Sequence, residues 1–243
     1  MLILEVENLS KSFGGVQALR KVEFVLNEGE ILGLIGPNGS GKTTLFNLIA
    51  GLMKSDEGKI RFKDRDITNV KSYRVCQSGI ARTFQIVRPF AHLTTLQNVM
   101  VGRAYGGNPV RNMHQAKRES EEILKYIGLG GKESIAAHSL TLVDRKRLEL
   151  ARALATKPEL LLLDEMMAGL NPTEVEDAMR LIKRIRDSGV TLIMVEHVMK
   201  AVMGISDRIM VLNVGEKIAE GTPQEISSNK QVIEAYLGEE ANA

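Results

Sequence analysis

Short apolar runs alternate along the chain with segments whose apolar residues recur at helical spacing. Residues 160–163 are all leucine and residues 190–195 are almost all apolar. Such runs are typical of central parallel strands covered on both faces. In residues 19–26, by contrast, Val22, Phe24 and Leu26 alternate with polar positions, as in a strand with one exposed face. Further strands are predicted at residues 2–9, 30–35, 58–63, 80–85, 208–212 and 216–220.

Helical patterns fall between these strands. Residues 92–156 are predicted to be mainly helical, with a break at residues 106–109. Asn171, Pro172 and Glu174 together predict a helix start with a capping box, and Gly189 predicts the end of that helix. A helical tail is predicted at residues 223–237. The alternation of apolar strands and helices predicts an α/β fold with a doubly wound, mostly parallel sheet.

Composition narrows the class of protein. The chain has 243 residues, of which 44% are hydrophobic and 26% charged, as expected of a folded globular chain. A net charge of only +2 argues against nucleic acid as a partner, because broad phosphate-backbone binding needs a clearly basic face. The single cysteine, Cys76, excludes a disulfide framework and a cysteine-based zinc site.

The N-terminus and the apolar runs also bear on location. Acidic residues occur within the first seven positions, too early for a secretory signal. No apolar run approaches the ~18 residues that a membrane helix needs. We therefore expect a cytoplasmic chain that reaches a membrane only through partners.

Residues 36–43 read GPNGSGKT and fit the phosphate-loop pattern G-x-x-x-x-G-K-[ST]. A predicted strand precedes this segment and a predicted helix follows it, which is the context the motif requires. Glycines let backbone N–H groups close around an anion, and the helix N-terminus adds its positive dipole end. Lys42 is expected to reach the β- and γ-phosphates and Thr43 to ligate Mg²⁺. The chain is therefore predicted to bind a nucleoside triphosphate.

Polar side chains follow other predicted strands. Gln85 ends one, Asp164 and Glu165 end the leucine run, and His197 follows the strand at 190–195. In α/β sheets, ligands collect beyond the carboxyl ends of the strands. Each signal alone is weak, since a strand-end amide, a helix-capping acid or a satisfied histidine is common. Beside a phosphate loop, Asp164 is expected to hold Mg²⁺ through water, Glu165 to act as a general base, and Gln85 and His197 to contact the metal, the water or the γ-phosphate.

These residues resemble the ATPase domain of ABC transporters over the whole chain. The phosphate loop matches Walker A of that family, residues 160–165 match Walker B with its catalytic glutamate, and residues 168–172 look like the D-loop. Gln85 resembles the Q-loop glutamine, His197 the switch histidine and Phe13 the adenine-stacking aromatic. Residues 81–85, 88–90 and 232–238 are similar to the ATPase subunits of branched-chain amino acid importers.

The resemblance implies a P-loop NTPase fold with an N-terminal antiparallel β subdomain and an inserted α-helical subdomain. Residues 1–86 and 157–220 are then the nucleotide-binding core, 87–156 the helical subdomain and 221–243 a C-terminal tail. ATP and Mg²⁺ are the implied cofactors. The implied catalytic residues are Glu165, His197 and Gln85, and the implied metal ligands are Thr43, Gln85 and Asp164. Nucleotide contacts are expected from Phe13, Val16, Gly36, Pro37, Asn38, Gly39, Ser40, Gly41, Lys42, Thr43 and Thr44.

The resemblance also implies partners. Two such domains face each other with ATP between them, docked under membrane-spanning permease subunits at the cytoplasmic face. The second ATPase domain is another copy or a different chain. The permease contact is expected around residues 86–96 and the helical insert, and no contact with the cargo is expected.

One motif of this sequence differs from the family pattern, namely the family signature LSGGQ. It aligns with residues 140–144, which read LTLVD. Thr141 keeps a hydroxyl, but Val143 replaces a glycine, resists positive φ and blocks close approach of the backbone. Asp144 is expected to cap the helix start and to repel the phosphate of a partner's ATP, offset in part by residues 145–147. A smaller departure is Met166, where the family usually has proline. This chain's own phosphate-loop site is therefore predicted to be complete, and the site to which it lends its signature impaired.

Two alternatives remain open from sequence. One is an ABC-type ATPase that acts without a membrane, although these usually carry paired domains, long inserts or basic extensions. The other is a weakly catalytic subunit, favoured by Val143 and Asp144 but opposed by Glu165 and His197. A GTPase is disfavoured because the Asn-Lys-x-Asp motif is missing from the sequence, and a small-molecule kinase because the strand-end residues suit attack by water.

Overall fold

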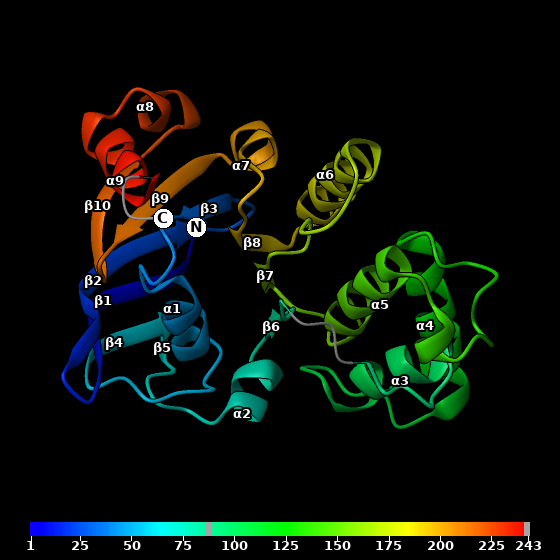
Figure 1. Ribbon diagram of the computed structural model, residues 1–243. Helices are drawn as coiled ribbons and strands as arrows, with labels where there is room; N and C mark the ends of the chain where they lie inside the picture. Colours follow the sequence, from blue (N-terminus) through cyan, green and yellow to red (C-terminus); the bar gives the residue numbers. More distant parts are fainter. Residues whose placement is uncertain (86–88, 241–243) are drawn as a thin grey trace.

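The computed structural model describes residues 1–85 and 89–240, which form two sheets flanked by helices (Figure 1). The smaller sheet is antiparallel, with strand order β2-β1-β4-β5. Its strands are β1 (Leu2–Phe13), β2 (Val16–Asn27), β4 (Glu57–Phe62) and β5 (Arg65–Asp66). The buried and exposed residues of β2 largely alternate, so only one face of this strand is covered.

The larger sheet has strand order β10-β9-β3-β8-β7-β6. It consists of β3 (Ile31–Ile35), β6 (Ile80–Arg82), β7 (Leu160–Asp164), β8 (Thr191–Val195), β9 (Arg208–Asn213) and β10 (Glu216–Gly221). All neighbouring strands are parallel except β10, which runs antiparallel to β9. Every residue of β3, β7 and β8 is buried, as expected for central strands covered on both faces.

Alternate residues of the central strands face two separate hydrophobic cores. On β7, Leu160 and Leu162 join the core under the antiparallel sheet and α1 (Lys42–Ile49). Leu161 and Leu163 face the other core, with α6 (Pro172–Asp187) and α7 (Met199–Ile205). The period of two along a strand therefore explains why one leucine run supports two layers.

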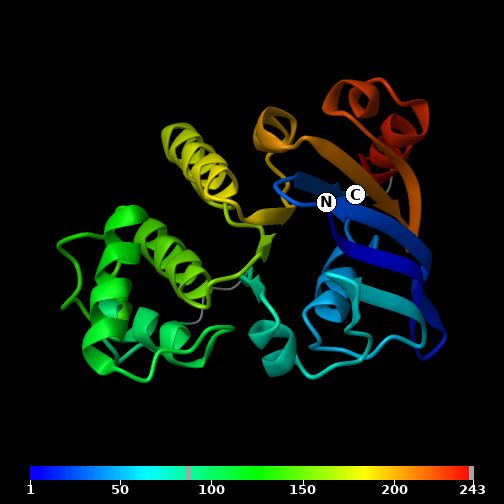
Figure 2. The same cartoon turned by 180° about the vertical axis from the view of Figure 1, so that it is seen from behind.

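Three helices between β6 and β7 pack against one another. They are α3 (Thr95–Tyr105), α4 (Met113–Tyr126) and α5 (Leu142–Ala155), with a 3-10 turn at Ala137–Ser139. In both views they lie away from the antiparallel sheet, at the other end of the molecule (Figures 1 and 2). The tail carries α8 (Pro223–Ser227) and α9 (Lys230–Glu240). None of the described helices is long and apolar enough to cross a bilayer.

The predicted α/β class with a mostly parallel sheet is confirmed. Asn171 caps α6 through a capping box with Glu174, and Gly189 follows its end with φ +99°. The prediction for 80–85 was too long, because β6 ends at Arg82 and Phe84 N–H donates instead to a side chain of α5. The helices α2 (Ser72–Gln77) and α7 were not predicted, since fewer than two turns leave no visible apolar period.

Candidate functional site

The phosphate loop lies between β3 and α1, and its backbone requires glycine. Gly36, Gly39 and Gly41 have φ of +149°, +76° and +105°. A Cβ atom on Gly36 would lie 2.0 Å from the carbonyl oxygen of Leu212, and one on Gly41 would lie 2.6 Å from that of Ala18. The loop is therefore pressed against β9 and β2 in a conformation that other residues rarely adopt.

Lys42 folds back over this loop. Its ammonium donates to the carbonyl oxygens of Gly36 at 2.7 Å and Pro37 at 2.8 Å, and the residue is 7% exposed. Helix α1, which Lys42 begins, has no side-chain cap and no acidic residue in its first turn. Its first N–H groups and its positive dipole end are thus left to an anion, next to a buried lysine.

Glu165, Gln85 and His197 come together as the sequence predicted. Gln85 Nε2 donates to Glu165 Oε2 at 2.8 Å, and His197 Nε2 lies 3.0 Å from Glu165 Oε1. The register of β7 and β8, which pairs Asp164 with Val195, sets these residues side by side. Glu165 itself has φ +47°, an uncommon conformation for a residue with a Cβ atom. The carboxylate is therefore held between two side chains from different strand ends.

Asp164 has a buried partner that the sequence did not reveal. Arg82 Nη2 lies 2.7 Å from Asp164 Oδ2, and Arg82 Nη1 donates to Asn47 Oδ1 at 2.5 Å. The two charged side chains are 6% and 5% exposed. Arg82 thus joins β6, α1 and the end of β7. The sequence places a polar residue at or near the end of each of these strands, Arg82 and Asp164, but it does not show that the two side chains form a pair.

Phe13 and Val16 lie at the exposed turn between β1 and β2. They are 46% and 69% exposed, and the Lys11 ammonium lies 5.6 Å from the centre of the Phe13 ring. Further along β2, Ala18 and Leu19 touch the phosphate loop at Gly41. The stacking of Phe13 on a base stays a prediction.

The degenerate signature, residues 140–144, is capped by a different residue than expected. Thr141, and not Asp144, caps α5, because the Thr141 side chain accepts a hydrogen bond from Asp144 N–H at 3.2 Å. Asp144 is buried and pairs with Lys132 at 2.6 Å, so its charge is compensated within the chain. Val143 lies in the first turn of α5 without positive φ. The expected capping of α5 by Asp144 was therefore wrong. The obstruction by Val143 and the repulsion of a partner's phosphate by Asp144 stay predictions.

Two buried glutamates lie close to the site. Desolvation by burial raises the pKa of Glu149 to about 7, although its carboxylate accepts from Phe84 N–H at 2.6 Å. Burial likewise raises the pKa of Glu196 to about 7. The same effect lowers the pKa of the neighbouring Lys146 and Arg152. The sequence analysis did not predict these buried charged residues. The spacing of Lys146 and Glu149, three residues apart on the face of α5 that also carries buried Ala153, could have indicated them.

The predicted magnesium ligands offer oxygen donors, which Mg²⁺ prefers. They are the Thr43 hydroxyl, the Asp164 carboxylate and the side-chain amide oxygen of Gln85. The amide nitrogen of Gln85 donates a hydrogen bond to Glu165. Among residues 1–85 and 89–240, no three His, Cys, Asp or Glu side chains are grouped to hold a metal. The donor set therefore fits an ion that keeps waters and nucleotide phosphates among its ligands.

Comparisons with known proteins identify relatives of this chain. The ABC transporter family matches residues 19–168, and the branched-chain amino acid ATP-binding cassette transporter family matches residues 216–242. The chain is 41% identical to the high-affinity branched-chain amino acid transport ATP-binding protein LivG of Salmonella typhimurium, over 98% of each chain. It is 38% identical to BraF of Pseudomonas aeruginosa, a protein with the same description, again over 98% of each chain.

Solved structures share the fold. The ADP conformation of an ATP-binding cassette of an ABC transporter has a TM-score of 0.90 at 32% identity, covering 98% of this chain and 99% of that one. A nucleotide-free cassette has a TM-score of 0.88 at 32% identity, covering 97% and 99%. A dimeric cassette in a post-hydrolysis state, bound to ADP and Pi, has a TM-score of 0.82 at 26% identity, covering 91% and 99%.

Proposed function

The chain belongs to the ABC transporter family of ATP-binding subunits, a family of ATPases, and from that premise we propose that it drives import of branched-chain amino acids. The single observation that carries the hydrolytic part is the Glu165 carboxylate, held between Gln85 and His197 where β7 ends. The names of the relatives support the cargo. Residues that select the cargo are expected on the other subunits.

The proposed reaction is the attack of water on the γ-phosphorus of ATP. Lys42 and the first turn of α1 bind the phosphates. As the new P–O bond forms, Glu165 accepts a proton from the water, His197 donates a hydrogen bond to the γ-phosphate, Gln85 orients the water, and the bond to ADP breaks. Bound Mg²⁺, held by Thr43, Asp164 and Gln85, would neutralise charge on the phosphates. Phe13 and Val16 are proposed to contact the nucleoside.

The hydrogen bonds seen at Glu165 belong to a resting arrangement in this proposal. Both carboxylate oxygens are engaged, one by Gln85 and one by His197. The attacking water and the γ-phosphate replace these two bonds, which frees each side chain for its role. Arg82 keeps Asp164 oriented meanwhile.

We propose the same assembly for this chain that the resemblance implies. A second ATPase domain closes on ATP, and permease subunits contact residues 86–96 and the helical insert, of which 86–88 lie outside the described residues. The chain then sits peripherally on the cytoplasmic face. The division into a core at 1–86 and 157–220, a helical subdomain at 87–156 and a tail at 221–243 belongs to this proposal.

Glu165→Gln tests the hydrolytic role. The amide keeps the size of the side chain but is not a base, so turnover should fall by roughly 100-fold or more while ATP binding persists. Steady-state phosphate release and equilibrium nucleotide binding measure the two quantities. Glu23→Gln, on the exposed face of β2, is the control. Turnover of Glu165→Gln within a few-fold of the wild type would rule out Glu165 as the base.

The cargo needs a separate experiment. The chain is reconstituted with the permease and solute-binding subunits with which it co-purifies, and ATP turnover is measured with leucine and with unrelated solutes. Stimulation by leucine, isoleucine or valine is the expected result. Stimulation only by other solutes would contradict the cargo and leave the ATPase role intact.

A further inference from the structure

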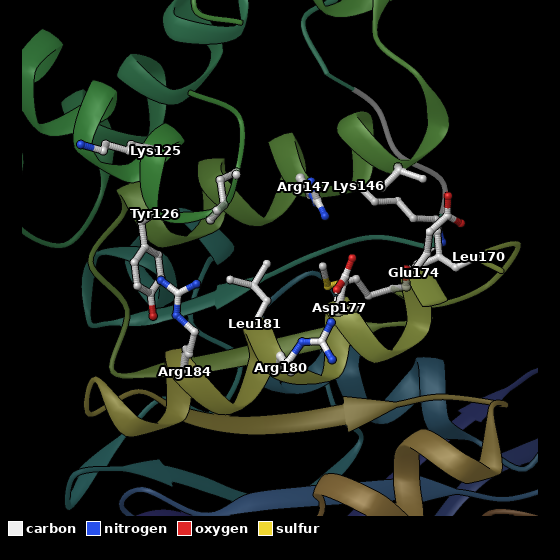
Figure 3. A pocket seen from close by; sticks show the side chains of 15 residues that line it. Lys125, Tyr126, Lys146, Arg147, Leu170, Glu174, Asp177, Arg180, Leu181 and Arg184 are labelled. Atoms are coloured by element: carbon white, nitrogen blue, oxygen red, sulfur yellow. Dashed lines mark hydrogen bonds and ion pairs between the residues drawn. The ribbon is translucent and has the colours of Figure 1, made fainter. Parts of the chain in front are cut away.

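The ammonium of Lys146 is buried against the loop that follows Glu165. It donates to the carbonyl oxygens of Glu165, Met166 and Ala168 at 3.2, 2.9 and 2.6 Å, and Lys146 is 7% exposed. A lysine ammonium has three N–H donors, so this cage satisfies all of them. Figure 3 shows the side chain running from α5 toward the loop that carries Leu170, at one end of a cavity of about 420 Å³ between α4, α5 and α6.

Glu196 holds the same loop through a further hydrogen bond. It follows β8 directly, is 2% exposed, and accepts a hydrogen bond from Met167 N–H at 2.7 Å. Met166 and Met167 are buried, so the irregular backbone at these two residues cannot rely on water for its hydrogen bonds. One cation and one acid therefore replace water along this segment.

This contact bears directly on Glu165. The residue has φ +47°, a conformation that is uncommon for a residue with a Cβ atom and persists only where neighbours hold it. Its N–H donates to the Val195 carbonyl at 2.9 Å, and its own carbonyl accepts from Lys146. The backbone is thus fixed on both sides of the side chain that reaches Gln85 and His197.

We infer that Lys146 is a positioning residue for Glu165, and that it ties the helix carrying the degenerate signature to the carboxylate of the same chain. The inference rests on the proposed role of Glu165 as the base. A shift of α5 relative to the sheet moves the Lys146 ammonium, and with it three carbonyl groups beside Glu165. A change in the position of the α5 end then affects Glu165 of the same chain as well as the contact with the partner's ATP.

Lys146→Met tests this contact, because methionine keeps most of the length and the apolar packing but has no donor. A small misplacement of Glu165 should lower kcat by roughly 10- to 100-fold, with the Kd for ATP within about twofold of the wild type. Lys146→Arg, whose guanidinium also donates to carbonyl groups, should recover most of that loss. Lys125→Met is the matched control, since exposed Lys125 lines the far end of the same cavity (Figure 3).

A split between kcat and Kd, with rescue by arginine, separates positioning from a general loss of stability. If Lys146→Met keeps kcat within twofold of the wild type, or if Lys146→Arg is no better than Lys146→Met, Lys146 does not position Glu165. Should Lys146→Met fail to fold, Lys146→Gln, which retains a donor amide, undergoes the same comparison with Lys146→Arg. Glu165→Gln is measured in parallel: if it stays active, the proposed function falls first, whereas an inactive Glu165→Gln beside a fully active Lys146→Met overturns this inference alone.

Discussion

Glu149 shows how a single buried acid ties stability to pH. It lies on α5 and accepts from Phe84 N–H, with Arg152, Lys146 and Asp164 as the charged groups facing it. Burial dominates and raises its pKa from the usual 4.5 to about 7. The folded chain therefore holds this proton more tightly than the unfolded chain. The stability it contributes is fully present below pH 4.5 and is lost as the pH rises through about 7.

Glu149→Gln should remove this dependence while keeping an acceptor for Phe84 N–H. We expect wild-type stability to decline relative to the variant between about pH 4.5 and 7.5, by at most about 3 kcal/mol. Denaturant unfolding of both proteins at several pH values measures the difference, and Glu196 is common to both and cancels. Glu23→Gln, whose side chain is exposed, should track the wild type. A Glu149→Gln difference that stays constant with pH would contradict the burial argument.

At the scale of elements, the turn from β3 to α1 depends on Gly36. A Cβ atom there meets the backbone oxygen of Leu212 at 2.0 Å, and backbone cannot swing aside as a side chain can. Gly36→Ala should cost about 2 kcal/mol or more and lower Tm by at least about 4 °C, with weaker ATP binding. Thermal unfolding and nucleotide titration measure both. Gly130→Ala, whose added carbon meets atoms at ordinary distances of 3.6 Å or more, should change neither.

The elements and the site differ in how far the sequence predicts them. Fully apolar runs such as 160–163 predicted central strands, because a strand covered on both faces leaves no polar position. The sequence predicted Gln85, Glu165 and His197 because each of them ends or closely follows a predicted strand, and the neighbouring residues alone show that position. The Arg82–Asp164 pair and the Lys146 cage were not, because each partner comes from an element far along the chain. The cap of α5 was misassigned: Thr141 accepts the hydrogen bond from Asp144 N–H, and the Asp144 carboxylate pairs with Lys132, a partner that residues 140–144 alone do not indicate.

At the scale of the whole molecule, the two sides of the ATP site are unequal in this chain. The phosphate loop and the Glu165 group lie at the strand ends, with residues that suit binding and hydrolysis. The α5 end, which the proposed assembly presents to the partner's ATP, carries exposed Leu142 and then Val143. Asp144 is turned inward to Lys132. In the proposed assembly, each ATP lies between the phosphate loop of one chain and the α5 end of the other, so these two faces are two half-sites.

Val143→Gly should repair the half-site that this chain lends. The removed side chain lets the N–H groups of α5 approach the partner's γ-phosphate, at a cost of about 1 kcal/mol for glycine in a helix. The measurement is ATP turnover of the assembled transporter on a Glu165→Gln background, which silences this chain's own site if the partner is a different chain. We expect residual turnover to rise by about tenfold. Asp144→Gly should bring no such gain, because the Asp144 carboxylate is already neutralised by Lys132 and its loss leaves that lysine unpaired. If Val143→Gly leaves turnover unchanged in a heterodimer on this background, and in a homodimer that keeps Glu165, the bulk of valine is harmless at this position.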